Sequence, residues 1–172
     1  MFQDEARFGR IDDPRRCWAP APLRPMVRSA IVRQYTYAYA AVSPMDGVLD
    51  SLVLPEASTE AMNIFLAEVS ARHPDEFIVM VLDGAGWHRA HALIVPENVW
   101  FHFLPPYSPQ LNPAENLWDD LREKGFHNQV FPSLDAVEDR LVEQLARMER
   151  DQERVQGIAG WAWITSLNLN AN

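Results

Sequence analysis

Three acidic residues stand in contexts that would hold a carboxylate in a fixed position. Asp4 lies in a short, partly apolar segment near the start of the chain. Asp83 directly follows the apolar run Phe77–Leu82, and Glu115 stands within the stretch Leu104–Trp118. A carboxylate that the backbone holds in place can serve as a catalytic ligand, so these three acids are the first candidates for chemistry.

The stretch around Glu115 predicts a rigid bridge from a strand to a helix. Three prolines, Pro105, Pro106 and Pro109, stiffen the backbone and keep it out of helix and sheet. Asn112 suits the N-cap of a helix, and the proline after it suits the first helical position. Two interpretations of Glu115 stay open at this point: a catalytic ligand, or the acidic partner of Asn112 in a capping box.

The run Phe77–Leu82 predicts a strand that is buried on both faces of a sheet. Asp83 would then stand at its carboxyl end, followed by the glycines Gly84 and Gly86. Open α/β sheets bind their ligands at the carboxyl ends of their strands. Asp4, in the first strand, would be the third acid, beside Asp83 at this strand end and Glu115 at the helix start.

Three blocks of the chain resemble the catalytic blocks of the DDE transposases. They are Asp4-Glu5-x-x-Phe8, Leu82-Asp83-x-x-x-x-His88 and Leu104-Pro-Pro-Tyr-Ser-Pro-x-Leu-Asn-Pro-x-Glu115. The third block is long and specific, whereas the first two gain weight from their order. The resemblance is to the bacterial insertion-sequence group related to mariner elements, and it extends from Phe2 to about Phe131.

This resemblance implies a ribonuclease-H-like fold in which Asp4 and Asp83 lie on neighbouring central strands and Glu115 closes over them. Three close carboxylates repel one another unless a cation neutralises them, and oxygen ligands suit Mg²⁺ or Mn²⁺. The expectation is therefore two ions held by these acids. By resemblance, the reaction is cleavage of DNA at transposon ends followed by strand transfer into target DNA.

The apolar pattern predicts a fold of the α/β class. Its sheet is mixed, an antiparallel meander followed by parallel strands, with helices on both faces. Strands are expected at Phe2–Phe8, Arg16–Ala19, within Met26–Val42, and at Val48–Leu54, Phe77–Leu82 and Val99–Leu104. Helices are expected from Ser58 to His73, over Arg89–Leu93, from Pro113 to Lys124, and from Ser133 onward. Residues 1–156 would form the catalytic domain and residues 157–172 a C-terminal tail.

The net charge of −9 is unusual for an enzyme that acts on DNA, because duplex affinity comes largely from cations that meet phosphates. The charge is unevenly spread: residues 1–33 hold seven arginines and four acids, so this N-terminal segment is basic. Arg7 and its neighbours could contact the DNA backbone, or they could simply be solvated. The acidic remainder suggests that the chain does not hold DNA tightly by itself.

Several residues near the three acids have lesser or alternative roles. His88 and Asn112 could contact the substrate or stabilise their loops. Glu5 is expected to face away from Asp4, because neighbouring side chains of a strand alternate. Asp119, one turn beyond Glu115, is a rival third ligand or an exposed acid, and His102 is interpreted as structural.

The chain departs from the family pattern in ways that bear on its activity. Gly84 stands where relatives usually carry asparagine, and only 31 residues separate Asp83 from Glu115. Only three residues precede Asp4, whereas family members carry helix-turn-helix modules that bind DNA before this strand. Three interpretations stay open: half of a split or frameshifted reading frame whose modules another chain could supply, a decayed copy, or an excised catalytic domain. A dimer or larger assembly on DNA is expected. The alternatives are a catalytically silent remnant that associates with a full-length transposase, or a general metal-dependent nuclease.

The composition predicts a folded protein in a reducing compartment. With 48% apolar residues the chain can form a substantial core, and with one cysteine, Cys17, it has no internal disulfide and no cysteine-based zinc site. No signal peptide and no long apolar run are recognisable, so a cytoplasmic bacterial protein without a membrane partner is expected.

Overall fold

The computed structural model describes residues 1–10, 16, 18–26 and 32–166. The strands are β1 (Phe2–Gly9), β2 (Tyr35–Val42), β3 (Leu49–Leu54), β4 (Ile78–Leu82) and β5 (Val99–Phe103). The α-helices are α1 (Thr59–Arg72), α2 (Ala114–Leu121), α3 (Leu134–Glu149), α4 (Gln152–Ala159) and α5 (Ala162–Thr165). Two 3-10 turns, Gly86–Arg89 and Pro109–Leu111, and a π-helical turn, Arg122–Phe126, complete the described elements.

The strands form one mixed sheet in the order β3-β2-β1-β4-β5. β1 pairs antiparallel with β2 and parallel with β4, so β1 and β4 lie side by side near the middle. Phe2 is paired with Val81, and the same register continued by two residues brings Asp4 level with Asp83. The sheet therefore places the first two acids next to each other, although they are 79 positions apart in the sequence.

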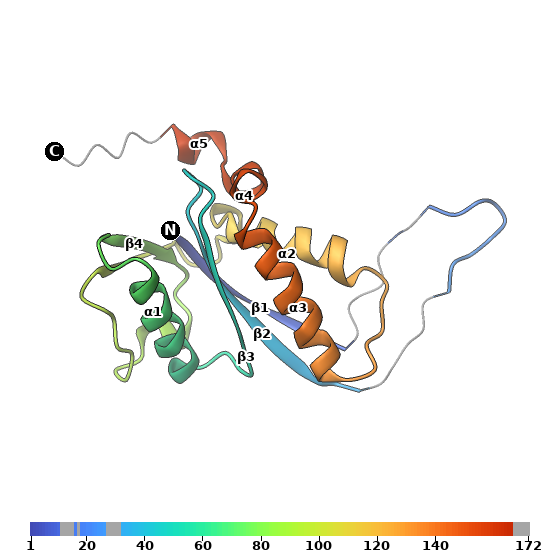
Figure 1. Cartoon of the computed structure of the whole chain (residues 1–172), viewed down its shortest axis with the longest axis horizontal. Coiled ribbons are helices and arrows are strands. Elements are labelled where there is room, and N and C mark those ends of the chain that lie inside the picture. Colours follow the sequence, from blue (N-terminus) through green and yellow to red (C-terminus); the bar gives the residue numbers. More distant parts are fainter. Residues whose placement is uncertain (11–15, 17, 27–31, 167–172) are drawn as a thin grey trace.

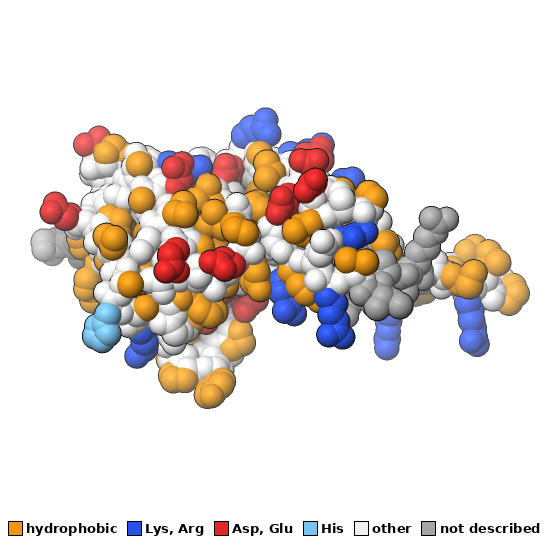
Figure 2. Space-filling model, turned by 90° about the horizontal axis from the view of Figure 1, so that it is seen from below, with side chains coloured by type: hydrophobic (Ala, Val, Ile, Leu, Met, Phe, Trp, Pro, Cys, Tyr) orange, Lys and Arg blue, Asp and Glu red, His pale blue; other side chains and the backbone are white. Residues whose placement is uncertain are grey.

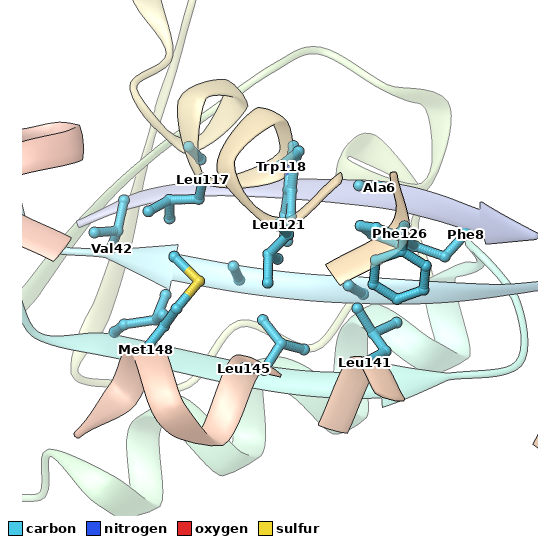
Figure 3. Close-up of a cluster of buried hydrophobic side chains, with 14 of the residues drawn as sticks. Ala6, Phe8, Val42, Leu117, Trp118, Leu121, Phe126, Leu141, Leu145 and Met148 are labelled. Atoms are coloured by element: carbon cyan, nitrogen blue, oxygen red, sulfur yellow. The ribbon is translucent and has the colours of Figure 1, made fainter. Parts of the chain in front are cut away.

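One face of the sheet is covered by α2, α3 and α4, which share a single apolar core with β1, β2 and β3. Figure 3 shows Leu117 and Trp118 of α2 and Leu141, Leu145 and Met148 of α3 pointing toward the strands. These five side chains are almost fully buried. The core fixes α2 against β1, and with it the helix start that carries Glu115.

The other face of the sheet is covered by α1, on the opposite side from α2 and α3 (Figure 1). Its buried residues are Ala61, Met62, Phe65, Leu66 and Val69. They pack against Tyr39 of β2 and Met80 of β4, among others. The predicted mixed sheet with helices on both faces is thus confirmed.

The two long helices begin where the sequence predicts. Ser58 and Ser133 each accept a hydrogen bond on the side-chain oxygen from the backbone N–H three residues later, at 3.2 Å in both cases. Both residues have extended backbone angles, as N-caps do. The predicted apolar stripe of α3 faces the core, and it also includes the buried Gln144.

The prediction that β4 is buried on both faces is wrong. Ile78, Met80 and Leu82 point into the core under α1, but Val79 is 44% exposed on the opposite face. The core formed by α2, α3 and α4 contains no residue of β4 or β5. An apolar run cannot distinguish this half-covered strand from one that is covered on both sides.

Other predicted elements also differ in extent. In Arg16–Ala19, the described residues Arg16, Trp18 and Ala19 form no strand, and Cys17 lies outside the described residues. The extended segment predicted within Met26–Val42 is a strand only from Tyr35, and residues 27–31 are likewise outside the description. The sequence also predicts a turn over Gly9–Asp13, of which only Gly9 and Arg10 are among the described residues.

Two helical segments near the acids also have bounds that differ from the predicted ones. Helical backbone after Asp83 covers Gly86–Arg89 and not Arg89–Leu93. The helix expected to run to Lys124 ends as an α-helix at Leu121 and continues as the π-helical turn. Glycine after Lys124 favours the end of the helix there. Gly125 instead lies buried inside that turn, where an added Cβ would come within 3.1 Å of the Gln144 side chain.

The division of the chain at residue 156 stays a prediction. Residue 156 lies inside α4, which contributes Val155 and Ala159 to the core, and Ile164 of α5 is also buried. Among the described residues, no helix combines the length and the apolar character needed to cross a bilayer.

A histidine at the end of α1 ties this helix to β3 and predicts a pH-dependent stability. His73 Nε2 lies 2.7 Å from Asp50 Oδ2, and Nδ1 lies 2.7 Å from Glu76 Oε2. Burial lowers the pKa of His73, but the hydrogen bonds and charges of Asp50 and Glu76 outweigh it and raise this pKa above its ordinary value. The stabilisation is therefore complete below the ordinary pKa and is lost as the pH rises through the raised one.

We expect His73→Gln to lower the free energy of unfolding by about 1 kcal/mol at pH 5.5 and by clearly less at pH 9. Urea unfolding at the two pH values measures the difference. Arg147→Gln, which removes the exposed Arg147–Glu143 pair, is the control and should change little at either pH. An equal loss at both pH values for His73→Gln would show that the histidine charge does not contribute.

Candidate active site

Asp4 is held by a tryptophan from the neighbouring helix. Its position on β1 turns its side chain toward α2, where Trp118 Nε1 donates a 2.8 Å hydrogen bond to Asp4 Oδ2. Trp118 is itself buried and packs edge-on against Phe8. The acid therefore stands at the boundary between the apolar core and the open end of the sheet.

Asp83 stands one residue beyond β4, at the start of the loop that follows. Its Oδ1 accepts a 2.9 Å hydrogen bond from the backbone N–H of Ala85, the pattern of an Asx turn. His88 Nδ1 lies 2.9 Å from the same oxygen. The Asp83 side chain is nevertheless 59% exposed, so its carboxylate is accessible to a ligand.

Glu115 is placed in the first turn of α2 by the proline-rich bridge, and Asn112 anchors that bridge. The buried Asn112 side chain donates to the backbone oxygen of Gln3 at 2.9 Å, next to Asp4 on β1. Its Oδ1 accepts from the backbone N–H of Ala114 at 3.1 Å, while its own N–H donates to Pro109. The capping box that would need the Asn112 N–H for Glu115 is therefore not formed.

The three acids line one pocket of about 580 Å³. Its other walls come from the loop after β4 and from the bridge between β5 and α2. The pocket lies at the carboxyl ends of the parallel strands β4 and β5, the edge where open α/β sheets bind their ligands. A strand, a strand end and a helix start thus bring Asp4, Asp83 and Glu115 to the same cavity.

The electrostatics of the pocket favour a cation. Burial is the main cause that raises the pKa of the Asp4 carboxyl to about 8, and the charges of Glu115 and Glu5 add to the rise. The hydrogen bond from Trp118 acts in the opposite direction. Burial and negative charge, the causes that raise this pKa, are both offset when a carboxylate binds a cation.

The pKa of Glu115 is raised as well. Burial is again the first cause, and the charges of Asp119 and Asp83 add to it, whereas the Arg122 guanidinium opposes the rise. Asp119 itself is exposed and does not line the pocket, unlike Glu115. Glu115 is therefore the carboxylate of α2 that the pocket offers to a ligand.

Comparison with known proteins assigns the chain to a family. The model of the DDE superfamily endonuclease family matches residues 1–138, a range that contains all three acids. The chain belongs to the DDE superfamily of endonucleases. The uncharacterized protein y4pE/y4sA of Sinorhizobium fredii (strain NBRC 101917 / NGR234) is 42% identical to it over 104 residues, which make up 60% of this chain and 77% of that protein.

Solved transposase structures share the fold of this DDE superfamily member. A pre-cleavage Mos1 transpososome superposes with a TM-score of 0.62 at 15% identity, over 93% of this chain and 55% of the other. The Mos1 paired-end complex with the left transposon end gives 0.60 at 16% identity, over 92% and 55%. These similarities show a ribonuclease-H-like fold, and the chain spans about half the length of the transposases that it matches.

The donor set in this DDE pocket suits a hard divalent cation, because it consists of carboxylate oxygens. No group of three or more His, Cys, Asp or Glu side chains among residues 1–10, 16, 18–26 and 32–166 is arranged to hold a metal ion. Mg²⁺ binding does not require such a group, because Mg²⁺ keeps several waters and usually binds only one or two protein carboxylates beside substrate phosphates. The number of ions stays a prediction.

Of the three residues predicted as possible substrate or loop contacts, only one lines the pocket. Asn112 lines the pocket, whereas His88 is 2% exposed and lies behind Asp83. Burial lowers the pKa of His88, but the hydrogen bond and charge of Glu5 and the charge of Asp83 together raise it. Arg7 is not brought to the pocket: its exposed guanidinium lies 4.5 Å from the centre of the Tyr35 ring.

Sequence reasoning missed two residues that shape this DDE site, Trp118 and Arg89. Trp118 lies three residues after Glu115 on the same helix face, a spacing that could have signalled a shared neighbour. Arg89 lines the pocket, and its guanidinium rests 4.4 Å from the centre of the Phe103 ring. A Cβ at Gly84 would come within 3.1 Å of Arg89 Nη2, so the glycine leaves room for this arginine.

Proposed function

We propose that this chain is the catalytic domain of a bacterial transposase that cuts DNA strands at transposon ends and transfers them to target DNA. The observation that carries the proposal is the shared pocket of Asp4, Asp83 and Glu115, in which burial and the charge of Glu115 raise the pKa of Asp4 to about 8. Membership of the DDE superfamily supports the endonuclease part of this activity. The similar Mos1 structures, a complex with a transposon end and a strand transfer complex, support the rest.

In this proposal Asp4, Asp83 and Glu115 hold Mg²⁺ or Mn²⁺, the ions of two similar Mos1 paired-end complexes. When bound, two such ions would activate a water or a 3′-hydroxyl and stabilise the leaving oxygen of the phosphodiester. The exposed Asp83 offers a carboxylate oxygen to incoming solvent ions, whereas Asp4 gains its charge when a cation replaces its proton.

Two other side chains at the pocket would position the DNA. Arg89 is the basic residue among those that line the pocket, and Phe103 holds its guanidinium in place, so it suits a phosphate beside the reacting bond. Tyr107 is fully exposed at the pocket rim, with a positive φ of 57° after Pro106. An exposed aromatic ring suits stacking on an unpaired base.

The wider DNA contacts are proposed to come from basic side chains and from other protein parts. In Figure 2 a row of Lys and Arg side chains projects from the edge that leads toward the connection between β1 and β2. The Arg10 guanidinium is not proposed as a DNA contact, because it donates hydrogen bonds to the backbone oxygens of Phe131 and Pro132. We further propose that helix-turn-helix modules on another chain recognise the ends, that two or more copies assemble on the DNA, and that they act in the bacterial cytoplasm.

The decisive experiment incubates the purified chain with supercoiled plasmid and Mn²⁺, and follows conversion to the nicked form. We expect nicking that requires Mn²⁺ or Mg²⁺ and stops in EDTA, together with calorimetric Mn²⁺ binding. Nicking that persists in Asp83→Ala would come from another nuclease and would contradict the proposal. Absence of divalent-metal binding at millimolar concentration would end it.

A further inference from the structure

Glu5, the neighbour of Asp4, occupies the opposite face of β1 and has no place in the pocket. Its carboxylate is 7% exposed, and one oxygen, Oε1, accepts three hydrogen bonds. Gln3 Nε2 donates at 3.0 Å, Trp87 Nε1 donates at 3.3 Å, and His88 Nε2 lies at 2.9 Å. A carboxylate buried this deeply costs free energy, which these partners offset.

His88 connects this buried acid to the pocket. Its side chain is 1% exposed, and its second ring nitrogen, Nδ1, lies 2.9 Å from Asp83 Oδ1 and 3.2 Å from the Asp83 backbone oxygen. The imidazole therefore spans from Glu5 to Asp83 with one nitrogen on each carboxylate. Since Asp83 is the most exposed of the three pocket acids, it is the one whose side chain most needs such support.

We propose that Glu5 and His88 are positioning residues for Asp83, a buried carboxylate–histidine pair that fixes the pocket acid from behind. His88 and the Ala85 N–H both occupy Oδ1, and this turns Oδ2 toward an incoming cation. The adjacent acids of β1 thus serve the same site from its two faces, Asp4 directly and Glu5 through the histidine. This inference rests on the proposed metal-dependent function.

Partners behind a metal ligand orient it and raise its basicity, and their loss typically costs 10- to 100-fold in metal affinity. The test variant is His88→Phe combined with Glu5→Gln. The phenylalanine ring fills the buried volume of the imidazole, and the glutamine amide at position 5 leaves no unpaired buried charge. In the full chain we expect the Mn²⁺ dissociation constant, measured by calorimetry, to rise by about 10- to 100-fold. The single variant His88→Asn, whose side-chain amide can still donate to Asp83, should keep most of the wild-type affinity for Mn²⁺.

The chain offers a matched control at the end of α1. His73 bridges Asp50 and Glu76 through its two ring nitrogens, but none of these residues lines the pocket. His73→Gln should therefore reduce stability while it leaves the Mn²⁺ dissociation constant within about twofold of the wild-type value. If His73→Gln weakens Mn²⁺ binding as much as the test variant does, general destabilisation explains the loss and the inference is overturned.

The failure of this inference can be told from a failure of the proposed function. Wild-type protein that binds no Mn²⁺ defeats the proposed function. Wild-type binding together with a folded double variant of unchanged affinity defeats only the positioning role. If the double variant does not fold, Glu5→Gln alone decides: we expect at least a threefold weaker Mn²⁺ affinity, and an unchanged affinity overturns the inference.

Discussion

Asp4→Asn is expected to make the metal-free protein more stable at pH 9 and, at the same time, to abolish metal-dependent nicking of DNA. The stability effect comes from burial together with the charges of Glu115 and Glu5, which raise the pKa of Asp4 from 3.8 to about 8. The folded state then holds this proton more tightly than the unfolded state does. Ionised Asp4 therefore opposes folding above pH 8, and its cost fades as the pH falls toward 3.8.

A shift of this size would correspond to at most about 5–6 kcal/mol, and relaxation around the site reduces what is observed. We expect Asp4→Asn to raise the free energy of unfolding by about 2–4 kcal/mol at pH 9, with the gain shrinking steadily toward pH 4. Urea unfolding across this pH range measures it. Asp139→Asn, an exposed acid of α3, is the matched control and should stay within about 0.5 kcal/mol at every pH.

Mn²⁺ should reduce the stability advantage of Asp4→Asn over the wild-type protein. A ligand that binds only the folded state adds about 1.4 kcal/mol at ten times its dissociation constant, and the wild-type protein should gain this stabilisation while Asp4→Asn gains little. Wild-type protein that is more stable than Asp4→Asn at pH 9 without metal would contradict the electrostatic account of the pocket. Nicking by Asp4→Asn at the wild-type rate would contradict the catalytic role of the acid.

Much of the site could be anticipated because local rules control where backbone atoms go. Strand alternation places Asp4 and Glu5 on opposite faces of β1, and the proline-rich bridge fixes the start of α2. The family resemblance implied that the first strand and the strand before Asp83 are neighbours, and the observed parallel pairing confirms it. These are properties of segments, which a sequence pattern can carry.

What the sequence could not reveal depends on contacts between distant side chains. The spacing of Glu115 and Trp118 on α2 suggests a shared neighbour, but it does not reveal that the Trp118 ring nitrogen reaches Asp4, 114 positions away. The contact of His88 with Glu5 depends on the depth of the loop after β4, which the residue types do not specify. The exposed face of β4 was not predicted for a related reason. Whether this face is covered depends on where α2 and α3 pack, and they pack on β1, β2 and β3.

Glu115→Gln and Asp119→Asn should separate the two candidate ligands of α2. The residues lie one turn apart on the same helix, but Glu115 lines the pocket and Asp119 is exposed outside it. We expect Glu115→Gln to slow Mn²⁺-dependent nicking by roughly 100-fold or more, since it removes a charge aimed at the reacting centre. Asp119→Asn should stay within about threefold of the wild-type rate.

A second measurement on Glu115→Gln tests the same geometry without any catalysis. Because the charge of Glu115 helps to raise the pKa of Asp4, its removal should lower this pKa below about 8. Carboxyl-carbon NMR titration of Asp4 measures the change, and Asp119→Asn should leave the pKa of Asp4 nearly in place because Asp119 is not among its causes. If Asp119→Asn instead stops nicking while Glu115→Gln does not, the third carboxylate has been assigned to the wrong turn of α2.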